Sequence, residues 1–250
     1  MMLAEAIKTL LSVARPEVKE INGESYIVGY RGGERVAPVS YAPEPVKVHS
    51  LDAVVKLVEQ ELPNLPTPLF VHVDSHDFVR VFSDYATTAE KKIHHNPFER
   101  FSLCEATCKD IEPFSDCTMD YDMAMVSLRS MFIQNEGTEY LLGLLSSITE
   151  EDSSKSEDNG LSQTVTVRKG ISLVERVNVK PRVPLRPFRT FLEIEQPESE
   201  FLLRILPDKR IHLREADGGA WKLKARVSIA EYLSDRLKDV IDAENAIVMI

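Results

Sequence analysis

The change of hydrophobic period after residue 160 is the feature that most constrains the fold of this sequence. From Thr164 onward, apolar and polar residues alternate in short runs, which is typical of half-buried β-strands. The clearest runs are 164–167, 171–174, 177–179, 188–194, 201–206, 211–213 and 221–224. Strands gathered in this way, without regular alternation with helices, favour an antiparallel sheet. The sequence therefore predicts a strand-rich C-terminal core.

Helical patterns precede this core and follow it. Ser50 occupies an N-cap position before 51–59, where apolar residues recur at the spacing of one buried helix face. A second helical pattern runs over 119–148, and Gly137 is expected to divide it into two helices. A third predicts a C-terminal helix over 228–243. Shorter patterns predict a helix over 2–14, a strand over 25–30 with a turn at 31–34, and a hairpin of strands 69–73 and 77–82.

These elements together predict an α+β fold with a long central helical segment and a C-terminal helix. We expect an N-terminal helix and extended arm over 1–48, because prolines interrupt the chain at 38–45. Residues 49–250 are then one α+β domain, with an acidic loop inside it at 149–160. The apolar tail at 246–250 is expected to be covered, either within this fold or by a partner.

Composition limits the compartment and the partners. The net charge is −10, so the average field repels polyanions and any nucleic-acid contact needs a local basic patch. Neither a targeting segment nor a membrane span is recognisable, which predicts a protein of the cytoplasm. The three cysteines, Cys104, Cys108 and Cys117, favour reduced thiols over a disulfide framework.

The acidic balance is reversed between Val165 and Thr190. This stretch holds seven basic side chains and one acidic side chain. A cluster of this kind is suited to the phosphates of a nucleic acid or nucleotide. Two structural roles are also open to it: the arginines could discourage edge-to-edge pairing of strands, or they could pair with acids of another subunit. The candidate binding residues are Arg168, Arg176, Arg182, Arg186 and Arg189.

Two prolines give the end of this stretch a particular shape. Pro184 and Pro187 fix the backbone and remove donors, so the chain between them must run extended. If a strand continues through 188–194, Arg189 and Phe191 share one of its faces. The result is a rigid corner that presents Arg186 or Arg189 to a ligand. The alternative, slightly favoured, is that the arginine pairs internally with Glu193 or Glu195.

Catalytic and metal-binding patterns are weak. His72, Asp74, His76 and His94 are suitable donors for a metal-dependent hydrolase, and the cysteines could add thiolates. Their spacing matches no recognised ligand pattern, so no metal and no cofactor are predicted. There is also no G-x-S-x-G, P-loop or G-x-G-x-x-G motif. The sequence therefore favours a protein that is not an enzyme.

Three stretches resemble a known family. They are 93–99 (IHHNPFE), 183–199 (VPLRPFRTFLEIEQPES) and 215–221 (EADGGAW). These stretches, with the helix start at Ser50 and the strand at 164–170, resemble the YfdQ-like proteins, a phage and prophage family of unknown function. The resemblance covers about residues 48 to 240. It implies a bacteriophage or prophage origin, and with it the cytoplasm of a bacterial host, and carries no activity or catalytic residues to transfer.

The leading functional hypothesis is a non-enzymatic phage accessory protein that acts as a homo-oligomer in phage–host conflict or DNA metabolism. It follows from the resemblance, the lack of catalytic motifs and the apolar ends of the sequence. One alternative is a nucleic-acid or nucleotide-binding module that uses the arginine-rich corner. Another is a capsid-like or shell-forming protein.

Overall fold

A computed structural model describes most of the chain. The described residues are 5, 17–21, 24–29, 32–35, 44–64, 68–83, 100, 102–109, 111–148, 157–158, 163–169, 173–206 and 210–250. The predicted helix over 2–14 apart from Glu5, the prolines at 38 and 43, His94 and most of the acidic loop fall outside these residues.

The described residues form an α+β fold, as predicted. The helices are α2 (Leu51–Glu61), η1 (Leu62–Asn64), α3 (Tyr121–Ser130), α4 (Glu136–Ser147), α5 (Trp221–Arg236) and α6 (Lys238–Asp242). The strands are β1 (Glu17–Ile21), β2 (Glu24–Gly29), β3 (Gly32–Arg35), β4 (Val46–Val48), β5 (Leu69–Val73), β6 (Phe78–Phe82), β7 (Ser102–Thr107), β8 (Cys117–Asp120), β9 (Phe132–Ile133), β10 (Glu157–Asp158), β11 (Gln163–Lys169), β12 (Leu173–Val179), β13 (Arg182–Pro187), β14 (Ser199–Leu206), β15 (Arg210–Glu215) and β16 (Ala246–Met249). None of the helices in this part of the chain is long and apolar enough to cross a membrane.

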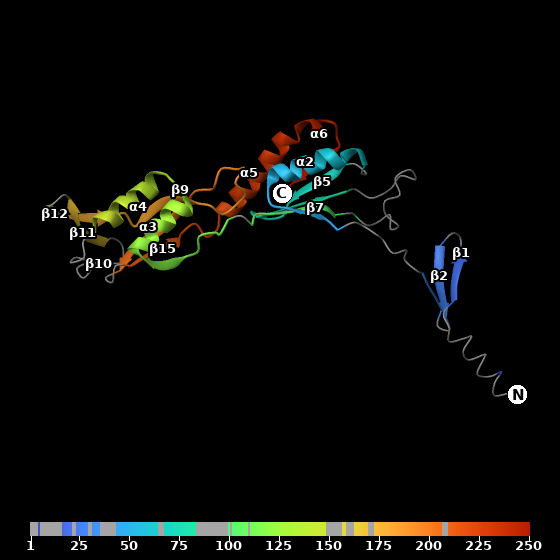
Figure 1. Ribbon diagram of the computed structural model, residues 1–250, viewed down its shortest axis with the longest axis horizontal. Helices are drawn as coiled ribbons and strands as arrows, with labels where there is room; N and C mark the ends of the chain where they lie inside the picture. The colour runs from blue at the N-terminus through green and yellow to red at the C-terminus, as the bar shows by residue number, and fades with distance from the viewer. Residues whose placement is uncertain are drawn as a thin grey trace.

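The first of two five-stranded sheets, called sheet 1, has the strand order β16-β5-β6-β7-β4. Its two outer pairs are parallel and its two inner pairs are antiparallel. Helices α2 and α5 contribute buried side chains to the core on one face of sheet 1. Figure 1 shows these helices, with α6, beside β5 and β7.

The second sheet, called sheet 2, has the order β8-β15-β14-β13-β9 and is antiparallel throughout. Helices α3 and α4 cover one of its faces, where Ala124, Leu128 and Leu141 join the buried strand residues. Figure 1 shows these two helices beside β9 and β15, further along the long axis of the molecule. Two smaller sheets complete the topology, β1-β2-β3 and β10-β11-β12.

The buried residues fall into two hydrophobic cores, one for each five-stranded sheet. Residues 49–250, predicted as one domain, therefore contain two cores. The core of sheet 1 takes residues from both ends of this range and also includes Phe191 and Ile194. The core of sheet 2 is built from residues between Met119 and Leu213. The segment 188–198 thus passes from one core to the other.

Local sequence signals explain several elements well. Ser50 caps α2 by accepting a hydrogen bond from the Ala53 amide at 3.2 Å, and the predicted face of this helix is buried. The hairpin of β5 and β6 forms as predicted, because apolar residues alternate along both strands. The apolar tail forms β16 and pairs in parallel with β5, but only Ala246 is buried, and Ile247 and Ile250 are 43% and 53% exposed.

Four predictions are wrong in detail. No strand forms over 188–194, where the chain is a loop, and 221–224 begins helix α5. The second error arose because Trp221 alternates with lysines locally, whereas burial of Trp221, Ala225 and Ile229 follows a helical spacing. The central pattern breaks at 131–135 and not at Gly137, and Gly32 to Glu34 belong to strand β3 and not to a turn.

Candidate nucleic-acid interface

Arg189 is buried at the junction of the two cores. Its side chain is 5% exposed and forms an ion pair with Glu215. Its Nη2 donates to the Pro197 carbonyl at 2.8 Å and to Ser199 Oγ at 2.5 Å, and its guanidinium stacks 3.9 Å above the Trp221 ring. Burial lowers the pKa of Arg189, and Glu215 acts in the opposite direction. Arg189 is therefore held by contacts within the chain and is not exposed at an open corner.

The loop that carries Arg189 is held by a buried glutamine. Gln196 accepts hydrogen bonds from the Arg189 and Thr190 amides at 2.9 and 3.2 Å. Its Nε2 donates to the Phe191 carbonyl at 2.9 Å. This single side chain takes the place of strand partners, since buried backbone groups must be paired. That is why the alternating residues of 188–194 do not form a strand.

A cavity of about 250 Å³ lies at this junction. His76 and Trp221 line it and meet edge to face, with ring centroids 4.7 Å apart. Burial lowers the pKa of His76, although Asp77 acts in the opposite direction. The charge of Arg189, which also lines this cavity, is neutralised by Glu215 and by Asp217, which accepts from Ser199 Oγ at 2.6 Å.

Arg186 lies in β13 and pairs within the chain. Its guanidinium hydrogen-bonds to Glu195, and its Nε donates to Glu198 at 3.2 Å. The bond to Glu198 is the main cause that raises the pKa of Arg186. The internal partner is thus Glu195, one of the two acids considered. Glu193 instead accepts from the Leu51 amide at 2.6 Å, at the start of α2.

The other candidates lie apart from this junction. Arg176 is exposed on β12 and stands opposite Thr166. Arg168 lies in β11 opposite Val174, and its side chain is outside the described part of the structure. Arg182 is exposed on β13 and belongs to sheet 2. The five arginines chosen from the sequence are therefore not brought together into one site.

The open face of sheet 2 gathers a different set of arginines around Arg182. Strand register places Arg182 and Arg214 on either side of Leu202, and the next residue pair is Arg204 with His212. Leu206 of β14 stands opposite Arg210 in the same way. We call this set the arginine stripe, and its members are Arg182, Arg204, Arg210 and Arg214. All four are exposed, on the face opposite the helices.

Acids lie at the margin of the stripe rather than within it. Arg214 approaches Asp116 at 3.6 Å, and both side chains are largely exposed, so this pair contributes little energy. Asp120 stands opposite Arg210, and its carboxylate caps α3 by accepting from the Met123 amide at 2.7 Å. Among the described residues, Arg182 and Arg204 form no ion pair. The centre of this face is therefore positive.

The position of the stripe bears on the role of strand arginines. Arginines that discourage aggregation are useful on edge strands. Strand β9 pairs only with Arg186 and Pro187, so among the described strands β13 is an open edge at Arg182, whereas Arg210 lies between β14 and β8. Edge protection therefore does not account for Arg210.

The metal and nucleophile candidates do not assemble in the described residues. No group of three histidine, cysteine or acidic side chains is arranged there to hold a metal ion. His72 approaches Asp74 at 3.8 Å and His76 approaches Asp77 at 3.7 Å, as separate pairs. The cysteines are free thiols, and burial raises the pKa of Cys104 to about 11. Cys104 is therefore protonated at neutral pH and unreactive.

Three members of the stripe escaped sequence reasoning because each sits in a strand defined by its apolar residues. In 201–206 and 210–215, buried Leu203, Ile205 and Ile211 fix the inward face. The intervening residues must then share the outward face, since side chains alternate along a strand. The alternation of apolar and polar residues thus placed these arginines on the outward face. Only the strand pairing showed that Arg182 and Arg214 lie on either side of the same residue, Leu202.

Comparisons of the chain with protein-family models, with curated proteins and with solved structures found no match.

Proposed function

We propose that this chain is a non-enzymatic nucleic-acid-binding protein, acting as an accessory protein of a phage or prophage. The observation that carries the binding proposal is the arginine stripe on the open face of sheet 2. Exposed guanidinium groups bind phosphates through paired, charge-assisted hydrogen bonds. The acidic balance of the rest of the chain then restricts a polyanion to this face. The family resemblance supports the phage setting.

Charge reversal of Arg182 and Arg204 tests the binding proposal. We expect the wild-type chain to bind a fluorescein-labelled 20-nucleotide DNA at 50 mM salt, measured by fluorescence anisotropy. The Arg182→Glu/Arg204→Glu variant should bind at least about tenfold more weakly, with a shallower dependence of affinity on salt, since each lost phosphate contact removes about 0.7–0.9 from the slope.

A matched control makes the same change in charge on the helical side. Lys224→Glu/Lys238→Glu alters exposed residues of α5 and α6. This variant should bind like the wild type within about twofold, because long-range effects are screened within about 10 Å at moderate salt. Absence of wild-type binding at 50 mM salt, or an equal loss in the control, would refute the proposal.

A second candidate function is self-assembly through the small N-terminal sheet. On β1 and β2, Val18 and Ile27 stand opposite each other and are 68% and 40% exposed. A three-stranded sheet with uncovered apolar residues gains little stability alone, which supports a covering partner. A second copy of the chain is the partner we propose, in keeping with a homo-oligomeric accessory protein.

Light scattering coupled to gel filtration tests this assembly at micromolar concentration. The wild type should have the mass of a dimer or larger, and Val18→Lys should shift it to the monomer. Leu192→Lys is the control, because Leu192 is also an exposed apolar residue, at 60%, but lies outside the small sheet. A monomeric wild type would remove this candidate without affecting the nucleic-acid proposal.

A further inference from the structure

Sheet 1 carries aromatic residues on the face that its helices do not cover. In β5 and β6, Leu69, Val71, Val79 and Val81 are buried in the core. The residues between them therefore point to the opposite face. They include Phe70, Phe78 and Phe82, which we call the aromatic face, together with His72 and Arg80. All three phenylalanines are only half-buried.

The rings of the aromatic face lie beside one another and beside guanidinium groups. Phe70 and Phe82 form a cross-strand pair, and their rings stack with centroids 5.4 Å apart. Arg100 lies 4.3 Å from the Phe70 centroid and 5.6 Å from that of Phe82. Arg80 lies 5.4 Å from the centroid of Phe78. Each ring is therefore paired with a cation, in an arrangement that holds both groups at the surface.

This face carries cationic side chains together with acids. Lys47 on β4 stands opposite Glu105 of β7, which is also the cross-strand neighbour of Arg80. The other acid near this face is Asp74, which follows β5 and approaches His72 at 3.8 Å. Among the described residues, Arg80 and Lys47 are thus matched by two acids, and Arg100 adds a further cation beside the Phe70 ring.

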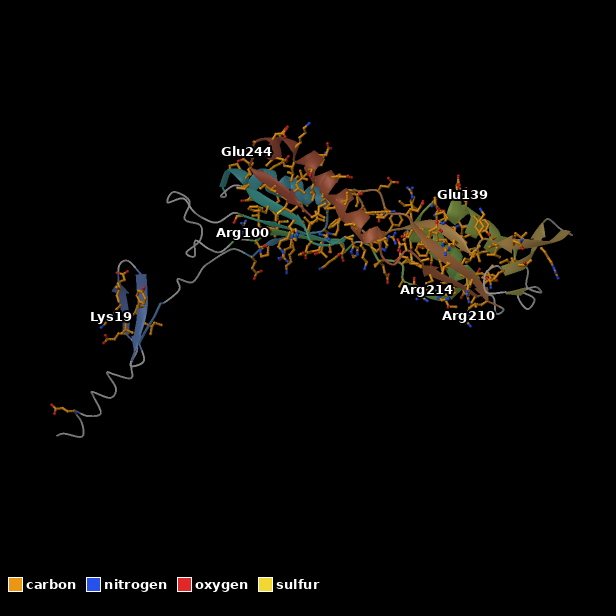
Figure 2. All side chains as sticks on the ribbon, turned by 180° about the vertical axis from the view of Figure 1, so that it is seen from behind. Lys19, Arg100, Glu139, Arg210, Arg214 and Glu244 are labelled. Atoms are coloured by element: carbon orange, nitrogen blue, oxygen red, sulfur yellow. The ribbon has the colours of Figure 1, made fainter. Side chains whose placement is uncertain are left out.

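The aromatic face and the arginine stripe lie on the same side of the molecule. Figure 2 labels Arg100, which lies over the Phe70 ring, and Arg210 and Arg214 of the arginine stripe. These three residues lie on the lower side of the molecule in this view. Glu139 and Glu244, which lie on or next to helices, lie along the upper margin. A ligand on one sheet can therefore continue onto the other along the same side of the molecule.

We infer that the nucleic acid bound by this protein is single-stranded, and that its bases stack on Phe70, Phe78 and Phe82. This inference rests on the proposed function and specifies its ligand. Bases of a duplex are stacked on one another and offer no free ring face, whereas unpaired bases stack on aromatic side chains whatever their sequence. The guanidinium groups next to the rings pair with the phosphates of the same strand. The arginine stripe binds phosphates further along it.

Competition between single strand and duplex tests this inference. With a labelled single-stranded 20-nucleotide DNA bound at 50 mM salt, the unlabelled single strand should displace it at least about tenfold more effectively than the duplex of equal length. The Phe70→Leu/Phe78→Leu variant keeps apolar bulk but removes two ring faces. It should lose this preference and bind both forms with the affinity that the wild type has for duplex. Leu223→Ala, an exposed apolar change on α5, should keep the preference.

The outcomes separate the inference from the proposed function. If nucleic acid binds through the arginine stripe but duplex competes equally and the phenylalanine variant is unchanged, the inference is wrong and the proposed function stands. If no nucleic acid binds, both fail. If the phenylalanine variant instead turns an oligomeric wild type into a monomer and leaves DNA binding intact, the inference is overturned and the aromatic face belongs to a second copy of the chain. Circular dichroism melts of each variant confirm that it is folded.

Discussion

Replacing Arg189 with methionine is expected to lower the free energy of unfolding by about 3 kcal/mol, because it removes one partner of a largely buried ion pair. Glu215 would keep its bond from Trp221 Nε1, at 3.1 Å, but would lose its cation. The Ser199 hydroxyl and the Pro197 carbonyl would each lose a donor in a place where water has little access. The stacking of Arg189 on Trp221 would also be lost.

Urea denaturation followed by fluorescence measures this effect directly. The sequence has one tryptophan, Trp221, so tryptophan emission reports on the junction itself. Arg186→Met is the matched control, since Arg186 also pairs with carboxylates but in an exposed position. It should cost less than about 1 kcal/mol. Equal losses in the two variants would show that the buried junction has no special role.

A double variant separates the ion pair from simple packing. Arg189→Met with Glu215→Gln removes the unpaired charge that the single variant leaves behind. It should therefore recover part of the lost free energy of unfolding. A double variant that loses the sum of both single effects would contradict the account of Arg189 and Glu215 as a coupled pair.

Gly137→Ala is expected to lower the free energy of unfolding by about 2 kcal/mol, although alanine is the better helix former. A Cβ atom at this position would lie 2.1 Å from the Pro184 carbonyl oxygen and 3.0 Å from Val183 Cγ1. The first of these is a backbone atom that cannot rotate away. Helix α4 would have to shift from β13, disturbing the core of sheet 2.

Gly143 provides the control on the same helix. No atom lies within 4 Å of a Cβ built there, so Gly143→Ala should stabilise the protein by about 0.5–1 kcal/mol. Thermal melts of both variants measure the difference. If Gly137→Ala also stabilised the protein, the close approach of α4 to β13 would be incorrect.

The sequence predicted those elements in which local signals and burial agree. Ser50 and the apolar spacing of 51–59 predicted α2, and alternation predicted β5, β6, β14 and β15. It failed at Phe188 to Ile194, where the side chain of Gln196 supplies hydrogen bonds that no local pattern contains. It also failed at Trp221, where burial of Ala225 and Ile229 further along favours a helix over a strand.

The candidate site was less predictable than the fold. Charge counting found Arg182 but grouped it with Arg189, which is buried, and with Arg186, which is paired. Charge density along a sequence does not show which arginines are neutralised by acids distant in the chain, such as Glu215. The stripe and the aromatic face both depend on strand register, which is set by long-range pairing.

The nesting of the two cores has a consequence for how this protein is made. Sheet 2 is built from residues 117–215, whereas sheet 1 needs β5 to β7 from earlier in the chain and β16 from residues 246–249. During synthesis, sheet 2 can form while Leu69, Val71 and Val81 are not yet covered by α5 and β16. Apolar strands that remain exposed in this way are prone to aggregate. The nascent chain should therefore depend on chaperones, and slower translation of residues 216–250 should lower its yield of folded protein, because it prolongs this exposure.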